Sequence, residues 1–186
     1  MERRATQTLE EEHHLIQQVV GAMAALADIV YEGQPADKEM LANFVEFMRV
    51  FVEKCHHEKE ENHLFPLLAS KGVPVAGCPI GALTREHQAA GKLTADLGAA
   101  VEAYLKSPAE MGLFLVTTLR SMAALYPGHI WKENYLLFPM TDKILNEKEQ
   151  QELAEKFESV DRKIGLDVHQ RLEQMAATLA ERAQGA

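Results

Sequence analysis

The chain has 186 residues, a formal net charge of −9 and a composition that is 47% hydrophobic and 25% charged. This length suits a single domain with a sizeable core, and the negative charge argues against nucleic-acid binding, which needs an excess of Lys and Arg. Two cysteines are too few for a disulfide framework, and neither a signal peptide nor a membrane-spanning apolar run is visible. We therefore expect a cytoplasmic protein that binds neither nucleic acid nor membrane.

Breaks rich in Gly, Pro and polar residues, at 32–37, 70–79 and 106–108, separate four stretches with helical periodicity. Apolar residues recur there every three or four positions, which predicts helices over about 8–32, 37–69, 80–106 and 108–142. Thr8 with Glu11 fits a capping box at the first start. Pro127-Gly128 is expected to kink or loosen the fourth helix directly before His129.

Four long helices joined mostly by short turns pack best as an antiparallel bundle. No stretch alternates with a period of two, so we predict an all-α fold, an up-down-up-down four-helix bundle over residues 1–145. After Asn146 two amphipathic stretches, separated by Gly165, predict two further helices. Residues 146–186 are expected to pack on the bundle as a C-terminal helical extension.

One motif occurs twice, His-x-x-Lys-Glu-x-x-x-Leu-Phe-Pro, beginning at His56 in the second predicted helix and at His129 in the fourth. Glu60 and Glu133 follow their histidines by four residues, so each pair projects from one helix face a single turn apart. Each of these helices can therefore offer an imidazole nitrogen and a carboxylate to the same point in space.

A weaker echo links the first and third predicted helices, which carry the dipeptides Glu12-His13 and Glu86-His87 near their starts. Every predicted core helix thus supplies one histidine. Glu12 and Glu86 either contact the ligand histidines from outside or face solvent, and we favour solvent.

Periodicity selects which of the adjacent histidines points inwards. His56 lies in line with Val52 on an apolar face, whereas His57 lies in line with Glu53 and Glu61 on a solvated face. The pattern therefore predicts that His56 faces the core and that His57 faces solvent.

The same test favours His13 over His14 in the first helix, because apolar residues accompany His13 and polar residues accompany His14. His87 and His129 also lie on apolar stripes. Four inward histidines and two inward glutamates must then share one bundle interior, where each unpaired carboxylate costs several kcal/mol. A metal is the simplest compensation, and the predicted ligands are His13, His56, Glu60, His87, His129 and Glu133.

The predicted ligand set is too large for a structural zinc site and too rich in imidazole for magnesium or calcium. Two ions that share both glutamates as bridges fit it better. Nitrogen and oxygen donors suit iron, with manganese and zinc as substitutes. We therefore expect two iron ions (Fe2+/Fe3+) with an oxo or hydroxo bridge.

The paired motifs, with Leu-Phe-Pro after each and Glu-His opening the first and third helices, resemble the hemerythrin-like HHE cation-binding family over about residues 8–142. The resemblance implies an up-down four-helix bundle, a non-haem di-iron centre and the same six ligands. Oxygen carriers of the family have a second histidine one turn after the third-helix ligand, where this chain has Gly91. Their last helix uses an aspartate five residues after its histidine, where this chain has Glu133 at four. The resemblance thus implies the more symmetric variant, without a five-histidine set.

These features predict a protein that binds or senses a small ligand, namely dioxygen, nitric oxide or peroxide. The alternative is an iron-dependent oxidoreductase, such as a peroxidase, a catalase or a nitric-oxide-handling enzyme. A ferritin-like site is rejected because the third and fourth helices lack its Glu-x-x-His pairs, and a metal-free helical interaction module is the remaining alternative. No protein partner is predicted.

Other residues near the motifs are interpreted individually. His63 is expected at the surface and Cys55 is expected to be an inert thiol. Tyr126 and Tyr135 either pack or contact a bound ligand, and His169 receives no role.

Overall fold

Helices form all the regular structure of this protein in the computed structural model, which describes residues 4–184. The prediction of an all-α fold is confirmed, since no strand occurs among residues 4–184. In chain order the α-helices are α1 (Ala5–Tyr31), α2 (Lys38–Phe47), α3 (Phe65–Ser70), α4 (Ile80–Lys106), α5 (Pro108–Lys132), α6 (Phe138–Ile144), α7 (Glu147–Ile164) and α8 (Leu166–Gln184). Three π-helical segments join some of them, namely η1 (Met48–His57), η2 (Glu60–Leu64) and η3 (Glu133–Leu137).

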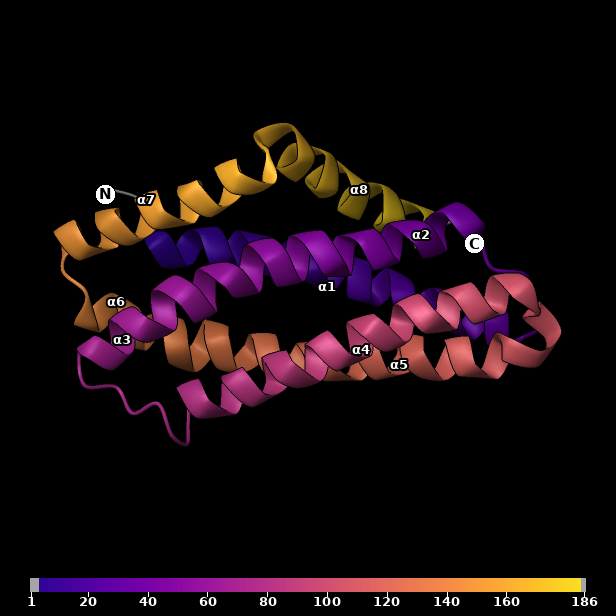
Figure 1. Cartoon of the computed structure of the whole chain (residues 1–186), viewed down its shortest axis with the longest axis horizontal. Coiled ribbons are helices and arrows are strands. Elements are labelled where there is room, and N and C mark those ends of the chain that lie inside the picture. The colour runs from indigo at the N-terminus through magenta and orange to yellow at the C-terminus, as the bar shows by residue number, and fades with distance from the viewer. Residues whose placement is uncertain (1–3, 185–186) are drawn as a thin grey trace.

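Four helical columns lie along the long axis of the molecule (Figure 1). The first column is α1, the second runs from α2 through η1 and η2 to α3, the third is α4, and the fourth runs from α5 through η3 to α6. The connections between successive columns alternate between the two ends of the molecule (Figure 1). Helix α5 packs against both α1 and α4, which places the first and third columns beside the fourth.

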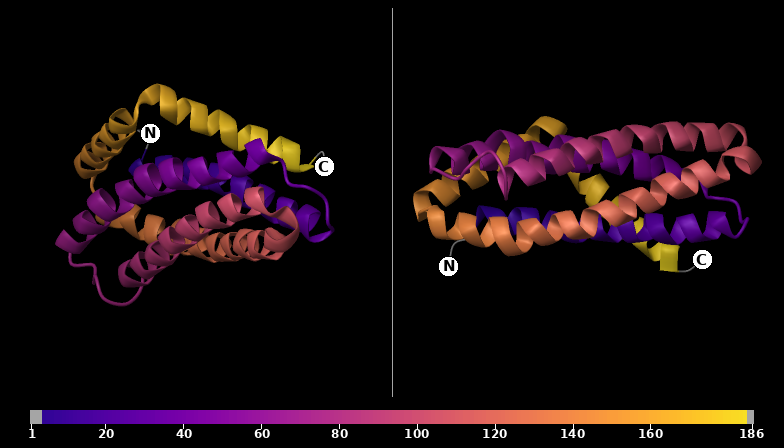
Figure 2. Two further views of the ribbon diagram at one scale, coloured as in Figure 1. Left: turned by 45° about the vertical axis from the view of Figure 1, so that its right-hand side comes forward. Right: turned by 90° about the horizontal axis from the view of Figure 1, so that it is seen from below.

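Helices α7 and α8 form an outer layer at one side of the columns, and the two further views show α8 crossing the columns at an angle (Figure 2). Helix α8 packs against α1 and α2. The Asn146 side chain caps α7 by accepting from the backbone N–H of Glu149 at 3.0 Å, and Gly165 ends α7 at a φ of 104°, which favours glycine. The predicted break at Gly165 is therefore confirmed.

The start of α1 differs from the predicted one. The helix begins at Ala5, so the predicted capping box of Thr8 and Glu11 is wrong. The backbone N–H of Arg4 instead donates to the side-chain oxygen of Gln7 at 2.9 Å. Gln7 thus gives the backbone N–H of Arg4 a hydrogen-bond acceptor. In the predicted capping box Glu11 would have had the same role for Thr8, about one turn later.

Both Leu-Phe-Pro sequences directly follow the π-helical segments. Pro66 and Pro139 lie in the first turns of α3 and α6, immediately after η2 and η3. Proline removes an N–H donor and crowds the carbonyl four residues before it, and the wider π turn relieves this crowding. Pro127, in contrast, lies inside α5, which continues to Lys132.

The core consists of two apolar clusters separated along the columns. The larger cluster includes Ile16, Phe51, Ala90 and Leu119, together with Leu172, Met175, Ala176 and Leu179 of α8. The smaller cluster includes Leu9, Leu64, Leu83 and Phe138, together with Leu153 and Phe157 of α7. In each column a predicted ligand histidine lies between members of the two clusters, as His13 does between Leu9 of the smaller cluster and Ile16 of the larger one.

Helix α1 is long and apolar enough to meet the length and hydropathy criteria for a membrane span. Thirteen of its residues are buried in the bundle, and they include Glu12 and His13. Packing of α1 against α5 and α8 accounts for its apolar character.

We expect α8 to contribute to the stability of the bundle. Replacing the buried Leu172 by alanine should lower the free energy of unfolding by about 2–5 kcal/mol, because it removes apolar contacts and leaves a cavity. Leu166→Ala is the matched control, since Leu166 is 63% exposed on the same helix. Urea denaturation followed by circular dichroism measures both, and equal losses would contradict the packing of α8 in the core.

Candidate metal centre

A layer of buried polar side chains crosses the bundle between the two apolar clusters. No member is more than 5% exposed. The polar layer consists of His13, His56, His57, Glu60, His87, His129 and Glu133. All six residues that the sequence predicts as ligands lie in this layer, and His57 joins them.

Potential ligand atoms in the polar layer fall into two groups, and within each group they lie within 4.8 Å of one another. The first group contains His13, His56, Glu60 and Glu133, and the second contains His57, His87 and His129. Each group is thus compact enough to surround a single cation.

Glu60 reaches both groups. Its Oε2 lies 3.6 Å from His56 Nε2 in the first group and 3.4 Å from His87 Nε2 in the second. Donor atoms that bind one ion at about 2.1 Å are separated by about 3.0 Å when adjacent and about 4.2 Å when opposite. The Glu60 carboxylate therefore has the position of a bridge.

Glu133 reaches both groups in the same way. Its Oε2 lies 3.1 Å from His13 Nε2 and 3.3 Å from His129 Nε2. Its Oε1 lies 3.6 Å from His87 Nε2. This carboxylate can bridge two ions from the side of the fourth column.

Among the described residues, 4–184, many of the inward-facing atoms of the layer find no hydrogen-bond partner. Both oxygens of Glu60 and Glu133 lack one, as do the Nε2 atoms of His57, His87 and His129. A buried polar atom without a partner costs about 1–3 kcal/mol, and more if it is charged. A cation in each group would supply the missing partner to all of these atoms.

Four of the histidines have an oxygen at their outer ring nitrogen. Such an acceptor holds the proton on Nδ1 and leaves the Nε2 lone pair directed into the layer, as a metal ligand requires. The outer pairs are His13–Asn134 at 2.6 Å, His56–Glu12 at 2.9 Å, His87–Glu61 at 2.7 Å and His129–Glu86 at 3.1 Å. The prediction that Glu12 and Glu86 face solvent is wrong for Glu12, which is buried, whereas Glu86 is partly exposed and still accepts from His129.

Burial controls the protonation of most of these imidazoles. It lowers the pKa of His56 to about 4, although Glu12 opposes the shift. Burial also lowers the pKa of His57 and of His129. For His87 the burial effect is outweighed by Glu133 and Glu61, which raise its pKa. His56, His57 and His129 are therefore neutral near pH 7, the form that binds a metal.

The two central carboxylates differ in the metal-free chain. Burial raises the pKa of Glu60 well above its usual range, and the nearby Glu133 charge adds to this effect. Burial would also raise the pKa of Glu133, but His129, His13 and His87 lower it well below its usual range. A divalent cation would compensate the negative charge of both carboxylates directly.

The family model of the hemerythrin HHE cation binding domain matches residues 4–141. The chain belongs to this family. The match covers the first three columns and ends at residue 141, inside α6, so helices α7 and α8 lie beyond it. Comparisons with curated proteins and with solved structures found no match.

His57 is the residue of this HHE domain that periodicity placed on the wrong face. It is 5% exposed and its ring stacks on that of His87, with the centroids 3.9 Å apart. The reason is η1, because a π-helix uses more residues per turn than the 3.6 of an α-helix. Successive residues are turned less, and His56 and His57 therefore both face the interior.

The buried position of His57 also changes the number of histidines that face the bundle interior. Gly91 does stand one turn after His87, as the sequence shows. His57 nevertheless completes a three-histidine group with His87 and His129. The expectation of four inward histidines is therefore corrected, because His57 of η1 is a fifth buried imidazole beside them.

The remaining residues near the motifs are divided between core and surface. Tyr126 is buried and its hydroxyl has no hydrogen-bond partner, whereas Tyr135 is exposed beside Trp131. Burial raises the pKa of the Cys55 thiol, which agrees with the predicted inert role. His63 is partly exposed.

His57→Ala should weaken metal binding in the three-histidine group. Loss of a ligand should exceed the roughly 10–100-fold loss of affinity that follows removal of an outer partner. His14→Ala is the control, because His14 is exposed on α1. Metal content after dialysis against a chelator measures the effect, and equal retention by both variants would contradict a ligand role for His57.

Acid should destabilise the metal-free protein through His56. Its pKa is 6.5 in the unfolded chain and about 4 in the folded one. Between these values the unfolded state binds more protons, so the free energy of unfolding decreases as the pH is lowered. At pH 5 the cost is on the order of 2 kcal/mol relative to pH 7. Denaturant titrations at both pH values should show this extra loss in the native sequence relative to His56→Gln. An equal pH dependence in the two would be the contrary result.

Proposed function

We propose that this protein is a non-haem di-iron protein that binds or senses a small ligand, namely dioxygen, nitric oxide or peroxide. An antiparallel, up-down-up-down bundle would hold two iron ions (Fe2+/Fe3+) in the polar layer. The observation that carries the proposal is the pair of buried carboxylates, Glu60 and Glu133, whose oxygens have no hydrogen-bond partner and face imidazole nitrogens of both groups.

The two groups would hold one ion each. His13 and His56 would bind the first ion, and His57, His87 and His129 would bind the second. Glu60 and Glu133 would bridge them, so the first ion receives four protein donors and the second receives five. With an oxo or hydroxo bridge between the ions, the first ion, which would have fewer protein donors, would be the one that binds a small ligand.

The donor set supports iron as the metal. Imidazole and carboxylate donors without thiolate suit iron, and manganese or zinc can substitute in vitro. When bound, an iron pair supplies redox chemistry and affinity for small ligands such as dioxygen. The protein residues orient the ligands and, through the apolar clusters on both sides, keep water from the layer.

We also propose a cytoplasmic location. Cys55 and Cys78 are both free thiols, and unpaired cysteines are typical of a reducing compartment.

Metal analysis of freshly purified protein tests the proposal. We expect about two iron ions per chain and an absorption spectrum with the bands of an oxo-bridged ferric pair. His56→Ala and Glu133→Ala should each lose iron, because each removes a ligand. A native protein without iron, or unchanged metal content in both variants, would instead indicate a metal-free helical module.

The same iron-loaded protein separates binding from catalysis. We expect no decomposition of hydrogen peroxide above the rate of free iron. Turnover that depends on His13 would establish the oxidoreductase alternative in place of a binding or sensing role.

A further inference from the structure

Behind His56 lies a buried pair of opposite charges formed by Lys59 and Glu12. Lys59, the lysine of the first repeated motif, donates through Nζ to Glu12 Oε1. The other oxygen of Glu12 accepts from His56 Nδ1 at 2.9 Å. The Lys59 side chain is 0% exposed and that of Glu12 is 5% exposed. We call this pair the inner clamp.

The second repeat builds the same arrangement behind His129. Lys132 donates through Nζ to Glu86 Oε1, and Glu86 Oε2 accepts from His129 Nδ1 at 3.1 Å. This outer clamp is about one third exposed, with 32% for Lys132 and 28% for Glu86. Solvent therefore screens the outer clamp far more than the inner one.

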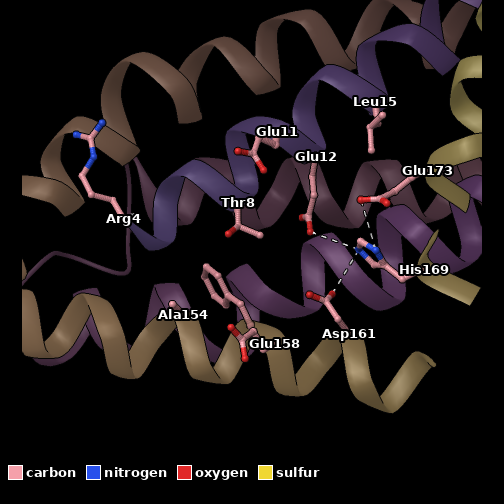
Figure 3. Close-up of a pocket in the computed structure, with 11 residues that line it drawn as sticks. Arg4, Thr8, Glu11, Glu12, Leu15, Ala154, Glu158, Asp161, His169 and Glu173 are labelled. Atoms are coloured by element: carbon pink, nitrogen blue, oxygen red, sulfur yellow. Dashed lines mark ion pairs between the residues drawn. The ribbon is translucent and has the colours of Figure 1, made fainter. Parts of the chain in front are cut away.

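Helices α7 and α8 bury the inner clamp with residues that lie beyond the family match. Asp161 of α7 accepts from Lys59 Nζ at 2.7 Å, and the same Oδ1 accepts from Cys55 Sγ at 3.0 Å. His169 of α8 directs Nε2 between two carboxylates, 3.5 Å from Asp161 Oδ1 and 3.9 Å from Glu12 Oε1 (Figure 3). These contacts tie the C-terminal helices to the residue that orients His56.

A pocket of about 380 Å³ opens beside this network, and Glu12, Asp161 and His169 line it (Figure 3). The same three residues with Cys55 have the composition of a metal site. The Lys59 ammonium, however, already contacts the carboxylate oxygens of Glu12 and Asp161 that a metal would need. Lys59 therefore compensates the negative charge of the network. The network contacts the metal centre through the hydrogen bond of Glu12 with His56.

The charges of the network affect His56 as a donor. Glu12 accepts from Lys59 Nζ through one oxygen and from His56 Nδ1 through the other, and the ammonium group beside it favours the charged carboxylate. Asp161 is a second carboxylate partner of Lys59. Lys59 therefore neutralises less of the charge of Glu12, and more of that negative charge acts on His56. A negative partner at Nδ1 raises the basicity of an imidazole ligand.

We infer that Asp161 and His169 are positioning residues for the metal centre, which hold the inner clamp and so strengthen His56 as a metal ligand in one half of the centre only. The inference rests on the proposed function. It assigns to α7 and α8 the role of making the two metal positions unequal. The outer clamp keeps the simpler arrangement, in which Lys132 and Glu86 meet near solvent.

Iron release to an excess of chelator tests the inference in the full chain. Asp161→Asn should accelerate the release of one of the two irons by about tenfold and leave the other unchanged. Glu158→Gln is the matched control, because it removes a carboxylate from the same helix and pocket. Glu86→Gln, at the outer clamp, should accelerate the release of the other iron. Mössbauer spectra should show a change at one iron of Asp161→Asn, which a general loss of stability would not produce.

A second variant keeps the test decisive if Asp161→Asn does not fold. His169→Phe retains a ring against Phe51, at a centroid distance of 5.4 Å, and removes the nitrogen that faces Glu12. It should accelerate release of the same iron. Native protein without iron would overturn the proposed function itself. Native protein with two irons, combined with unchanged release or equal acceleration of both irons in these variants, would overturn the positioning role alone.

Discussion

Two carboxylates, Glu60 and Glu133, lie fully buried in the middle of a helical bundle, and the arrangement of the whole molecule around them follows from the cost of that burial. A carboxylate without partners is among the most expensive groups to remove from water. Histidines from all four columns surround the pair, and three of them, His57, His87 and His129, have an Nε2 atom without a hydrogen-bond partner among residues 4–184. These buried groups therefore need the compensation that a bound cation would supply.

The rest of the fold supports this layer from outside. Oxygen acceptors at Nδ1 hold four of the imidazoles in one tautomer, and apolar clusters above and below limit access of water. The two halves are related by the repeated motifs, yet they are not equivalent. His57 adds a third imidazole to one half, and α7 and α8 bury the clamp behind the other. An asymmetric centre has therefore been built on an internally repeated sequence.

Much of the fold could be predicted because it depends on local patterns. Apolar periodicity and Gly or Pro breaks gave the helix boundaries within a few residues, except at the start of α1, where Gln7 takes the capping role earlier than Thr8 and Glu11 suggested. The six predicted ligands lie together for a similar reason, since a four-residue spacing on a helix faces one direction. His57 was missed because that argument assumes α-helical geometry throughout, and η1 does not have it.

The sequence by itself determined the all-α class and the spacing of histidine and glutamate along each helix, because both follow from rules that act within one or two turns. Only the tertiary structure decided that both adjacent histidines, His56 and His57, are buried, since the π-helical turns change the direction of every side chain after them. It alone also decided the partners of Glu12 and Lys59. Asp161 lies 102 residues after Lys59 and His169 lies 157 residues after Glu12, and such contacts depend on how α7 and α8 fold back over α1.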